Sequence, residues 1–245
     1  MSPSEKTKFI SNWIKSYVDQ MPVKAQSLVI GISGGIDSSV SSTLSAMTGI
    51  KTIVLTMPIR QKDNQHDLSL KHQEWLIKNF KNVEAHTINL DKLFESFSST
   101  LEKFDNEHGY ANSRARLRMT TLYQVAAANK GIVVGTGNKV EDFGVGFYTK
   151  YGDGGVDISP IADCNKTEVW ELGKELGILK EIIDAPPTDG LWDDGRTDEG
   201  QLGFKYEDLE DAMKNPNSPH RQEYEKIRKQ NLHKMEPIPV CKIPS

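Results

Sequence analysis

The chain has 245 residues, which is enough to bury a large core and fits one α/β domain better than two independent units. With 37% hydrophobic and 26% charged residues, its composition is that of a soluble globular protein. The net charge of −4 argues against a dedicated nucleic-acid binder, because such proteins usually carry a basic surplus.

The N-terminal residues and the cysteines indicate where the protein works. Residues 1–20 carry apolar side chains at helical spacing, which predicts an amphipathic helix rather than a signal peptide. No apolar run approaches the roughly 20 residues that span a bilayer. Cys164 and Cys241 lie far apart and outside any Cys-x-x-Cys pattern, so neither a disulfide framework nor a zinc site is predicted. We therefore expect a cytoplasmic protein that does not cross a membrane.

Further along the chain, the predicted elements alternate between strands and helices. Strands are predicted at 28–30, 51–57, 84–90 and 131–136, with a final one near 157–160. Helices are predicted at 38–47, 66–80, 113–129, 206–214 and 220–233, and another begins with Asp91 as its cap. This alternation predicts a Rossmann-like α/β fold, an open parallel sheet of about five strands with helices on both faces. In such a sheet the ligand lies beyond the carboxyl ends of the strands, so the residues after Ile32, Met57 and Val134 should converge.

A long segment near the C-terminus breaks the pattern. Residues 185–200 are rich in Pro, Gly and Asp, and the segment is too long for an ordinary connector. A mobile lid at about 185–205 is the functional interpretation and a flexible surface linker is the alternative; composition alone leaves both open. Since no repeat or low-complexity segment occurs, we expect a single domain over residues 1–245.

The segment Gly-Ile-Ser-Gly-Gly-Ile-Asp-Ser at 31–38 follows the first predicted strand directly. Gly34 and Gly35 can take positive φ and let backbone N–H groups approach an anion, while Ser38 and Ser39 begin a helix whose positive end faces the same point. The pattern predicts a phosphate-bearing ligand. It is not a Walker A loop, and Asp37 beside a polyphosphate requires a cation, for which magnesium is suited. An empty glycine-serine turn is the less specific alternative.

A second carboxylate follows the fourth predicted strand, in the stretch Gly-Thr-Gly-Asn-Lys-Val-Glu-Asp at 135–142. Glu141 is the candidate to complete the magnesium site that Asp37 opens, with phosphate oxygens and water as the remaining ligands. A solvated acid at a helix start is the alternative for Glu141 taken alone.

These motifs support a resemblance to a known family. Residues 33–38 resemble the Ser-Gly-Gly-x-Asp-Ser/Thr signature of the ATP pyrophosphatases, which cleave ATP between the α and β phosphates and adenylate a substrate oxygen. Three further segments narrow the resemblance to the ammonia-dependent NAD synthetases. They are Asn-Ser-Arg-Ala-Arg-Leu-Arg-Met at 112–119, Thr136 with Glu141 five residues later, and Thr-Lys-Tyr-Gly-Asp-Gly-Gly-Val-Asp at 149–157, with Lys166 at the start of the next helix. The similarity covers roughly residues 13–239. Because residues 144–147 are slightly longer than the family spacing, Lys150 is placed by its flanking residues.

The resemblance implies a ligase that uses ATP, Mg²⁺ and ammonia to amidate nicotinic acid adenine dinucleotide (deamido-NAD), through an adenylated carboxylate, to NAD. The implied ATP-binding residues are Gly31, Ile32, Ser33, Gly34, Gly35, Ile36, Asp37, Ser38, Thr136, Lys166 and Thr188. The implied deamido-NAD-binding residues are Arg116, Lys150, Asp157, His233 and Lys234. Asp37 and Glu141 would hold the metal, and Asp37, Lys166 and Asp157 would be catalytic. A structural turn role for Asp157 or Asp153 is at least as well supported as the role of accepting the proton of ammonium.

The resemblance also implies a homodimer whose interface helps to bind the dinucleotide. The sequence's own indication of an interface is the apolar helix at 113–129, which fits an internal core helix equally well. Three alternatives to the synthetase remain. The ATP pyrophosphatase domain of a GMP synthetase, or a tRNA-modifying relative, would keep the chemistry and change the substrate. A non-catalytic adenine-nucleotide sensor could dispense with Glu141.

Overall fold

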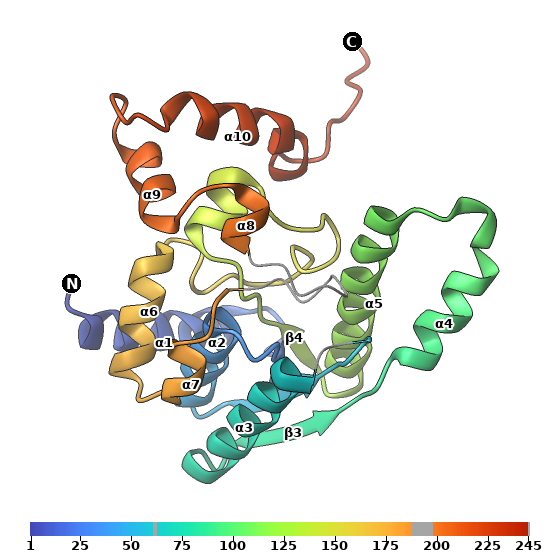
Figure 1. Ribbon diagram of the computed structural model, residues 1–245. Coiled ribbons are helices and arrows are strands. Elements are labelled where there is room, and N and C mark those ends of the chain that lie inside the picture. Colours follow the sequence, from blue (N-terminus) through green and yellow to red (C-terminus); the bar gives the residue numbers. More distant parts are fainter. Residues whose placement is uncertain (61–62, 188–197, 245) are drawn as a thin grey trace.

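The computed structural model describes residues 1–60, 63–187 and 198–244 (Figure 1). Its sheet contains four parallel strands, β1 (Ser27–Gly31), β2 (Lys51–Thr56), β3 (Val83–Thr87) and β4 (Gly131–Val133), in the order β3-β2-β1-β4. In the centre of the sheet, Val29 pairs with Ile53 on one side and Val133 on the other. The predicted α/β class and parallel sheet are confirmed.

The prediction of about five strands is wrong for the described part of the chain. In place of a strand at 157–160, the structure has one isolated parallel bridge between Val134 and Ile158. Pro160 follows two residues later, and because proline has no backbone N–H it cannot extend a hydrogen-bonded ladder. The chain therefore meets the end of β4 at one point and turns away.

Helices cover both faces of the sheet, because successive side chains of a strand point to opposite faces. On one face Leu28 and Ile30 pack in a core cluster with α1 (Pro3–Gln20), α2 (Ile36–Met47), α3 (Asp63–Asn79), α6 (Lys166–Glu175) and α7 (Lys180–Ile183). On the other face Val29 packs in a cluster with α4 (Asp91–Thr100) and α5 (Glu107–Ala128). A short 3-10 helix, Glu102–Phe104, joins α4 to α5.

A third cluster joins the C-terminal helices to the segment after β4. It contains residues of the π-helix η2 (Lys139–Val145), α8 (Asp198–Leu202), α9 (Tyr206–Lys214) and α10 (Arg221–Met235). Figure 1 shows α9 and α10 gathered at one end of the molecule, next to η2. This cluster brings α8, α9 and α10 next to the segment after β4, where the second strand-end motif lies.

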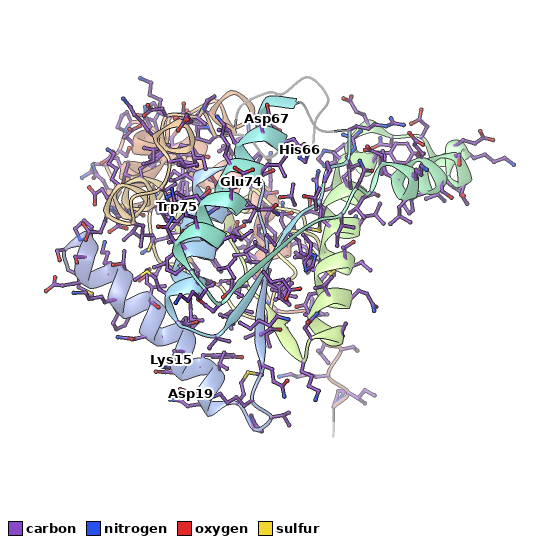
Figure 2. The ribbon with its side chains drawn as sticks, turned by 90° about the horizontal axis from the view of Figure 1, so that it is seen from below. Lys15, Asp19, His66, Asp67, Glu74 and Trp75 are labelled. Atoms are coloured by element: carbon purple, nitrogen blue, oxygen red, sulfur yellow. The ribbon has the colours of Figure 1, made fainter. Side chains whose placement is uncertain are left out.

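The N-terminal helix is amphipathic, as predicted. Ile10, Ile14 and Val18 are buried in the core, whereas its aromatic residues, Phe9 among them, lie on the exposed side. Figure 2 shows this helix, marked by Lys15 and Asp19, and α3, marked by His66, Asp67, Glu74 and Trp75. No helix among the described residues is long and apolar enough to cross a membrane.

The expected capping role of Asp91 is wrong. The cap of α4 is Leu90, and Asp91 is the first helical residue. Its carboxylate accepts hydrogen bonds from the backbone N–H of Arg60 (2.6 Å) and from Asn89 Nδ2 (2.9 Å). The carboxylate of Asp91 therefore accepts from the loop after β2 instead of capping the start of α4.

Candidate active site

One side of the candidate site is formed by the turn that connects β1 to α2. Gly34 has φ +89°, as its predicted freedom allows, but Gly35 has φ −87° and is the N-cap of α2. The helix therefore begins at Ile36, two residues before the predicted Ser38. Ser38 Oγ accepts from the backbone N–H of Ser33 (3.2 Å) and lies 3.1 Å from Ser33 Oγ. The hydroxyls close the turn, and the positive N-terminal end of α2 lies at the carboxyl end of β1.

Three charged side chains from three elements meet at this point. Asp37 lies in the first turn of α2, Glu141 lies in η2 beyond β4, and Lys166 is the first residue of α6. Lys166 Nζ is 2.5 Å from Asp37 Oδ2 and 2.9 Å from Glu141 Oε1. We call these three residues the ion cluster. The ends of β1 and β4 converge as predicted, whereas the end of β2 contacts α5, through Met57 O and Arg118 Nε (3.1 Å).

Burial controls the electrostatics of the ion cluster. Lys166 is 1% exposed, and although burial alone would lower its pKa, the two carboxylates raise it well above its usual value. Burial raises the pKa of Asp37, and the charge of Lys166 offsets this only in part. Burial would also raise the pKa of Glu141, but the charge of Lys166 and the hydroxyl of Tyr206 bring it below its usual value. The two carboxylates thus share one ammonium, and together they keep Lys166 charged.

The two carboxylates fit a hard divalent cation. Because one nitrogen contacts both, Asp37 and Glu141 lie close enough to share a single ion. Mg²⁺ usually binds through one or two carboxylates, with water and substrate phosphates as its other ligands. Among the described residues, no group of three or more His, Cys, Asp or Glu side chains could hold a metal. Asp37 and Glu141 are therefore the described residues that could hold a Mg²⁺ ion at this point.

Asn138, for which no role was predicted, connects α2, which carries Asp37, to η2, which carries Glu141. Its side chain is fully buried, and its Nδ2 donates to Asp37 Oδ1 (3.1 Å). Its Oδ1 accepts from the backbone N–H groups of Val140 and Glu141, both at 3.0 Å. Asn138 therefore caps η2 and ties it to α2. Its only signal in the sequence is its place inside the strand-end stretch 135–142.

The segment that carries Glu141 is a π-helix, Lys139–Val145. A π-helix closes each turn with an i→i+5 hydrogen bond and so holds more residues per turn than an α-helix. The backbone N–H of Gly146 donates to Glu141 O, which is such an i→i+5 bond, and Gly146 leaves the helix with φ +71°. The segment 144–147 lies where this wide turn ends.

The structure also brings together four of the five residues expected to contact the dinucleotide. Arg116 Nε on α5 donates to Lys150 O (3.3 Å), and Lys150 Nζ donates to His233 O (3.3 Å) on α10. The neighbouring Lys234 donates through Nζ to Tyr148 O (2.8 Å). Burial lowers the pKa of Lys234. Cationic side chains from three segments therefore gather beside η2.

The remaining predicted residues lie elsewhere. Asp157 accepts from Val133 N–H (2.7 Å) and from the Tyr123 hydroxyl (3.1 Å), so its carboxylate is engaged with β4 and α5. Burial and this carboxylate raise the pKa of Tyr123 to about 12. Thr136 is half-buried between β4 and Asn138. Thr188, with residues 188–197 of the expected lid at 185–205, lies outside the described residues.

Together, the parallel sheet, the Ser-Gly-Gly-x-Asp-Ser turn at a helix start and the second carboxylate at a neighbouring strand end define a nucleotide-binding α/β enzyme of the ATP pyrophosphatase type. The family model described as NAD synthase matches residues 6–243. The chain belongs to this family, whose members synthesise NAD, and it is a ligase that uses ATP.

Individual relatives agree with this assignment. The chain is 38% identical over 212 residues to the NH3-dependent NAD+ synthetase of Carboxydothermus hydrogenoformans, covering 84% of this chain and 83% of that protein. Its fold matches the NMN synthetase from Francisella tularensis with a TM-score of 0.91 at 32% identity, covering 99% and 100% of the two chains. The NH3-dependent NAD synthetase from Campylobacter jejuni matches with a TM-score of 0.79 over 99% and 100% of the chains, and at 23% identity it supports the fold alone.

Proposed function

We propose that the chain amidates deamido-NAD with ammonia, through an adenylated carboxylate, and releases NAD, AMP and pyrophosphate. The observation that carries this proposal is the ion cluster at the carboxyl ends of β1 and β4. An adenylating site must bring a polyphosphate and a carboxylate together, so it needs concentrated positive charge and fixed geometry more than it needs a general base. The nicotinate carboxylate, with an ordinary pKa of about 4, is already ionised at neutral pH.

Each residue of the ion cluster has a distinct role in this scheme. Asp37 and Glu141 would hold Mg²⁺, which would neutralise charge on the phosphates as pyrophosphate leaves. The two carboxylates raise the pKa of Lys166, although burial alone would lower it, so its ammonium would add a positive charge to the site at neutral pH. The turn at 33–38 and the N-terminal end of α2 would bind the phosphates.

The cationic group beside η2 would bind the second substrate. Arg116, Lys150, His233 and Lys234 come from α5, the segment after η2, and α10. A dinucleotide carries a pyrophosphate, and lysine and arginine side chains are its natural partners. The contacts of Asp157 and Thr188 with substrate remain predictions.

A homodimer and a cytoplasmic location are also proposals. Leu117, Leu122 and Val125 of α5 are only partly buried in the single chain, which supports a partner surface on this helix. Both cysteines are free, and burial raises the pKa of Cys164 to about 11, as suits a reduced and unreactive thiol. Light scattering during size-exclusion chromatography would measure the mass in solution.

A second candidate substrate is nicotinic acid mononucleotide, which the same chemistry would convert to NMN. The observation that favours it is the TM-score of 0.91 with the NMN synthetase from Francisella tularensis, over nearly the whole of both chains. Both substrates present the same nicotinate carboxylate, so the ion cluster does not distinguish them.

One assay separates these possibilities. The purified chain is incubated with ATP, MgCl2 and ammonium chloride, together with deamido-NAD, nicotinic acid mononucleotide or xanthosine monophosphate, and the products are resolved by chromatography. We expect one AMP per NAD formed from deamido-NAD, and no AMP from the Asp37→Ala variant. A higher kcat/KM with the mononucleotide would favour the second candidate. AMP with xanthosine monophosphate alone would favour a GMP synthetase, and no AMP with any substrate would favour a nucleotide sensor.

A further inference from the structure

Helix α9 presents two side chains, one helical turn apart, to the ion cluster. Tyr206 is fully buried, and its hydroxyl donates to Glu141 Oε1 at 2.5 Å. The same Oε1 accepts from Lys166 Nζ (2.9 Å), and that nitrogen lies 4.9 Å from the centre of the Tyr206 ring. Glu141 is thus held on one oxygen by a lysine from α6 and a tyrosine from α9.

Glu210 acts on the helix that carries Lys166. Its Oε1 accepts from the backbone N–H of Thr167 (3.0 Å) and its Oε2 from the Thr167 hydroxyl (2.7 Å). Thr167 is the second residue of α6, so the contact lies next to Lys166. A lysine at the first position of a helix opposes the helix dipole, and a carboxylate at the same end offsets that cost. Glu210 is 8% exposed, so solvent screens this interaction little.

We propose that Tyr206 and Glu210 are positioning residues of the active site, which fix Glu141 and the start of α6 so that the ion cluster keeps one geometry for binding the cation and ATP. This inference rests on the proposed Mg²⁺–ATP site. It makes that site depend on α9, although α9 itself supplies neither of the two carboxylates nor the lysine.

A substitution can separate the effect of the Tyr206 hydroxyl from the effect of packing by its ring. Its ring lies edge-on to Trp170, with centroids 5.8 Å apart, inside the cluster that also contains Val140 and Leu209. Phenylalanine keeps the ring, so Tyr206→Phe preserves the packing and removes the hydroxyl that donates to Glu141. Tyr224 belongs to the same cluster, is also buried (6% exposed) and lies on α10. Tyr224→Phe is therefore a matched control.

The test measures how ATP binding depends on Mg²⁺ without requiring turnover. The melting temperature of the full chain is followed with saturating ATP over a series of MgCl2 concentrations, and the Mg²⁺ dependence of kcat is measured in parallel. Removing a residue that orients a metal ligand typically costs 10–100-fold in metal affinity. We expect Tyr206→Phe to raise the half-effective MgCl2 concentration by about 10-fold, and Tyr224→Phe to leave it unchanged.

Glu210→Gln provides an independent variant, which keeps an acceptor for Thr167 and removes the charge. We expect an increase of about 3-fold in the KM for ATP, with the KM for the nicotinate substrate unchanged, as suits the loss of a helix-terminus charge. This variant carries the test if Tyr206→Phe gives no cooperative melting transition. An unchanged KM for ATP would overturn the role of Glu210.

The reference variant Asp37→Ala tests the proposed cation site separately from the positioning role of Tyr206. If Asp37→Ala keeps the wild-type Mg²⁺ dependence of the melting temperature, the proposed cation site itself is wrong. If Asp37→Ala abolishes that dependence while Tyr206→Phe and Tyr224→Phe behave alike, the site stands and the positioning role of Tyr206 is overturned.

Discussion

Replacing Lys166 with methionine tests the ion cluster most directly. Methionine has a similar length but no charge, so Asp37 and Glu141 would face each other as two buried carboxylates without the ammonium that now contacts both. Breaking a buried ion pair by removing one partner costs about 3–5 kcal/mol. Since 1 kcal/mol changes the melting temperature of a chain of this size by about 2–4 °C, we expect Lys166→Met to melt about 6–20 °C below wild type without ligands.

The assay is differential scanning calorimetry at neutral pH, without nucleotide or divalent cation. Lys139→Met is the matched control, because Lys139 Nζ also contacts a carboxylate, Asp163 Oδ1 at 2.7 Å, but at the surface, where the Asp163 side chain is 96% exposed. A surface pair of this kind contributes about 0–1 kcal/mol. Adding Asp37→Asn to Lys166→Met should recover part of the loss, since it removes one of the two opposed charges. Equal melting temperatures for Lys166→Met and Lys139→Met would refute the buried cluster.

Three further predictions concern the scaffold, and each is checked by urea unfolding. His72 is fully buried, its Nε2 lies 3.0 Å from Ser42 Oγ, and burial lowers its pKa from 6.5 to about 4. Because the unfolded chain binds the proton more readily between those values, the free energy of unfolding should fall by about 3 kcal/mol as the pH drops through them, and His72→Gln should lack that part of the decline. Gly146→Ala, with φ +71° and a new Cβ 2.7 Å from Asn231 Cβ, should cost more than Gly177→Ala, whose positive φ of +68° faces open space and costs about 1 kcal/mol; equal losses would contradict the contact. Tyr123→Phe removes one hydrogen bond to Asp157 and should cost about 1 kcal/mol, whereas unchanged stability would mean that this bond anchors nothing.

The fold could be predicted largely because its signals are local. Alternating apolar runs and helical periodicities identified all four strands, and the alternation itself specified a parallel sheet. The error at 157–160 has a physical cause that the sequence did contain, since Pro160 cannot donate to a ladder. The start of α2 was placed two residues late because Gly35, rather than a serine, caps it.

The site was predictable only where its residues belong to a motif. Asp37 and Glu141 each belong to a motif that follows the end of a strand, so the geometry of a parallel sheet brings them together. Asn138, Tyr206 and Glu210 act on partners 101, 65 and 43 residues away in the chain. Contacts at such separations leave no periodicity or spacing in a single sequence, so only the folded structure identifies these residues.

The ion cluster also explains how an aspartate can occupy the turn that we propose binds phosphate. A lone buried carboxylate at that position would be costly and would repel ATP, whereas the ammonium of Lys166 reduces both effects before any ligand binds. Asn138 ties Asp37 to η2 and Tyr206 donates to Glu141, so both carboxylates are held by hydrogen bonds that exist without any ligand. Such preorganised charge costs no rearrangement during the reaction, which is the main way that sites for phosphoryl and adenylyl transfer accelerate their chemistry. The burial of Lys166, which is unfavourable for folding when considered alone, is therefore the feature that makes the aspartate of the turn compatible with both stability and ATP binding.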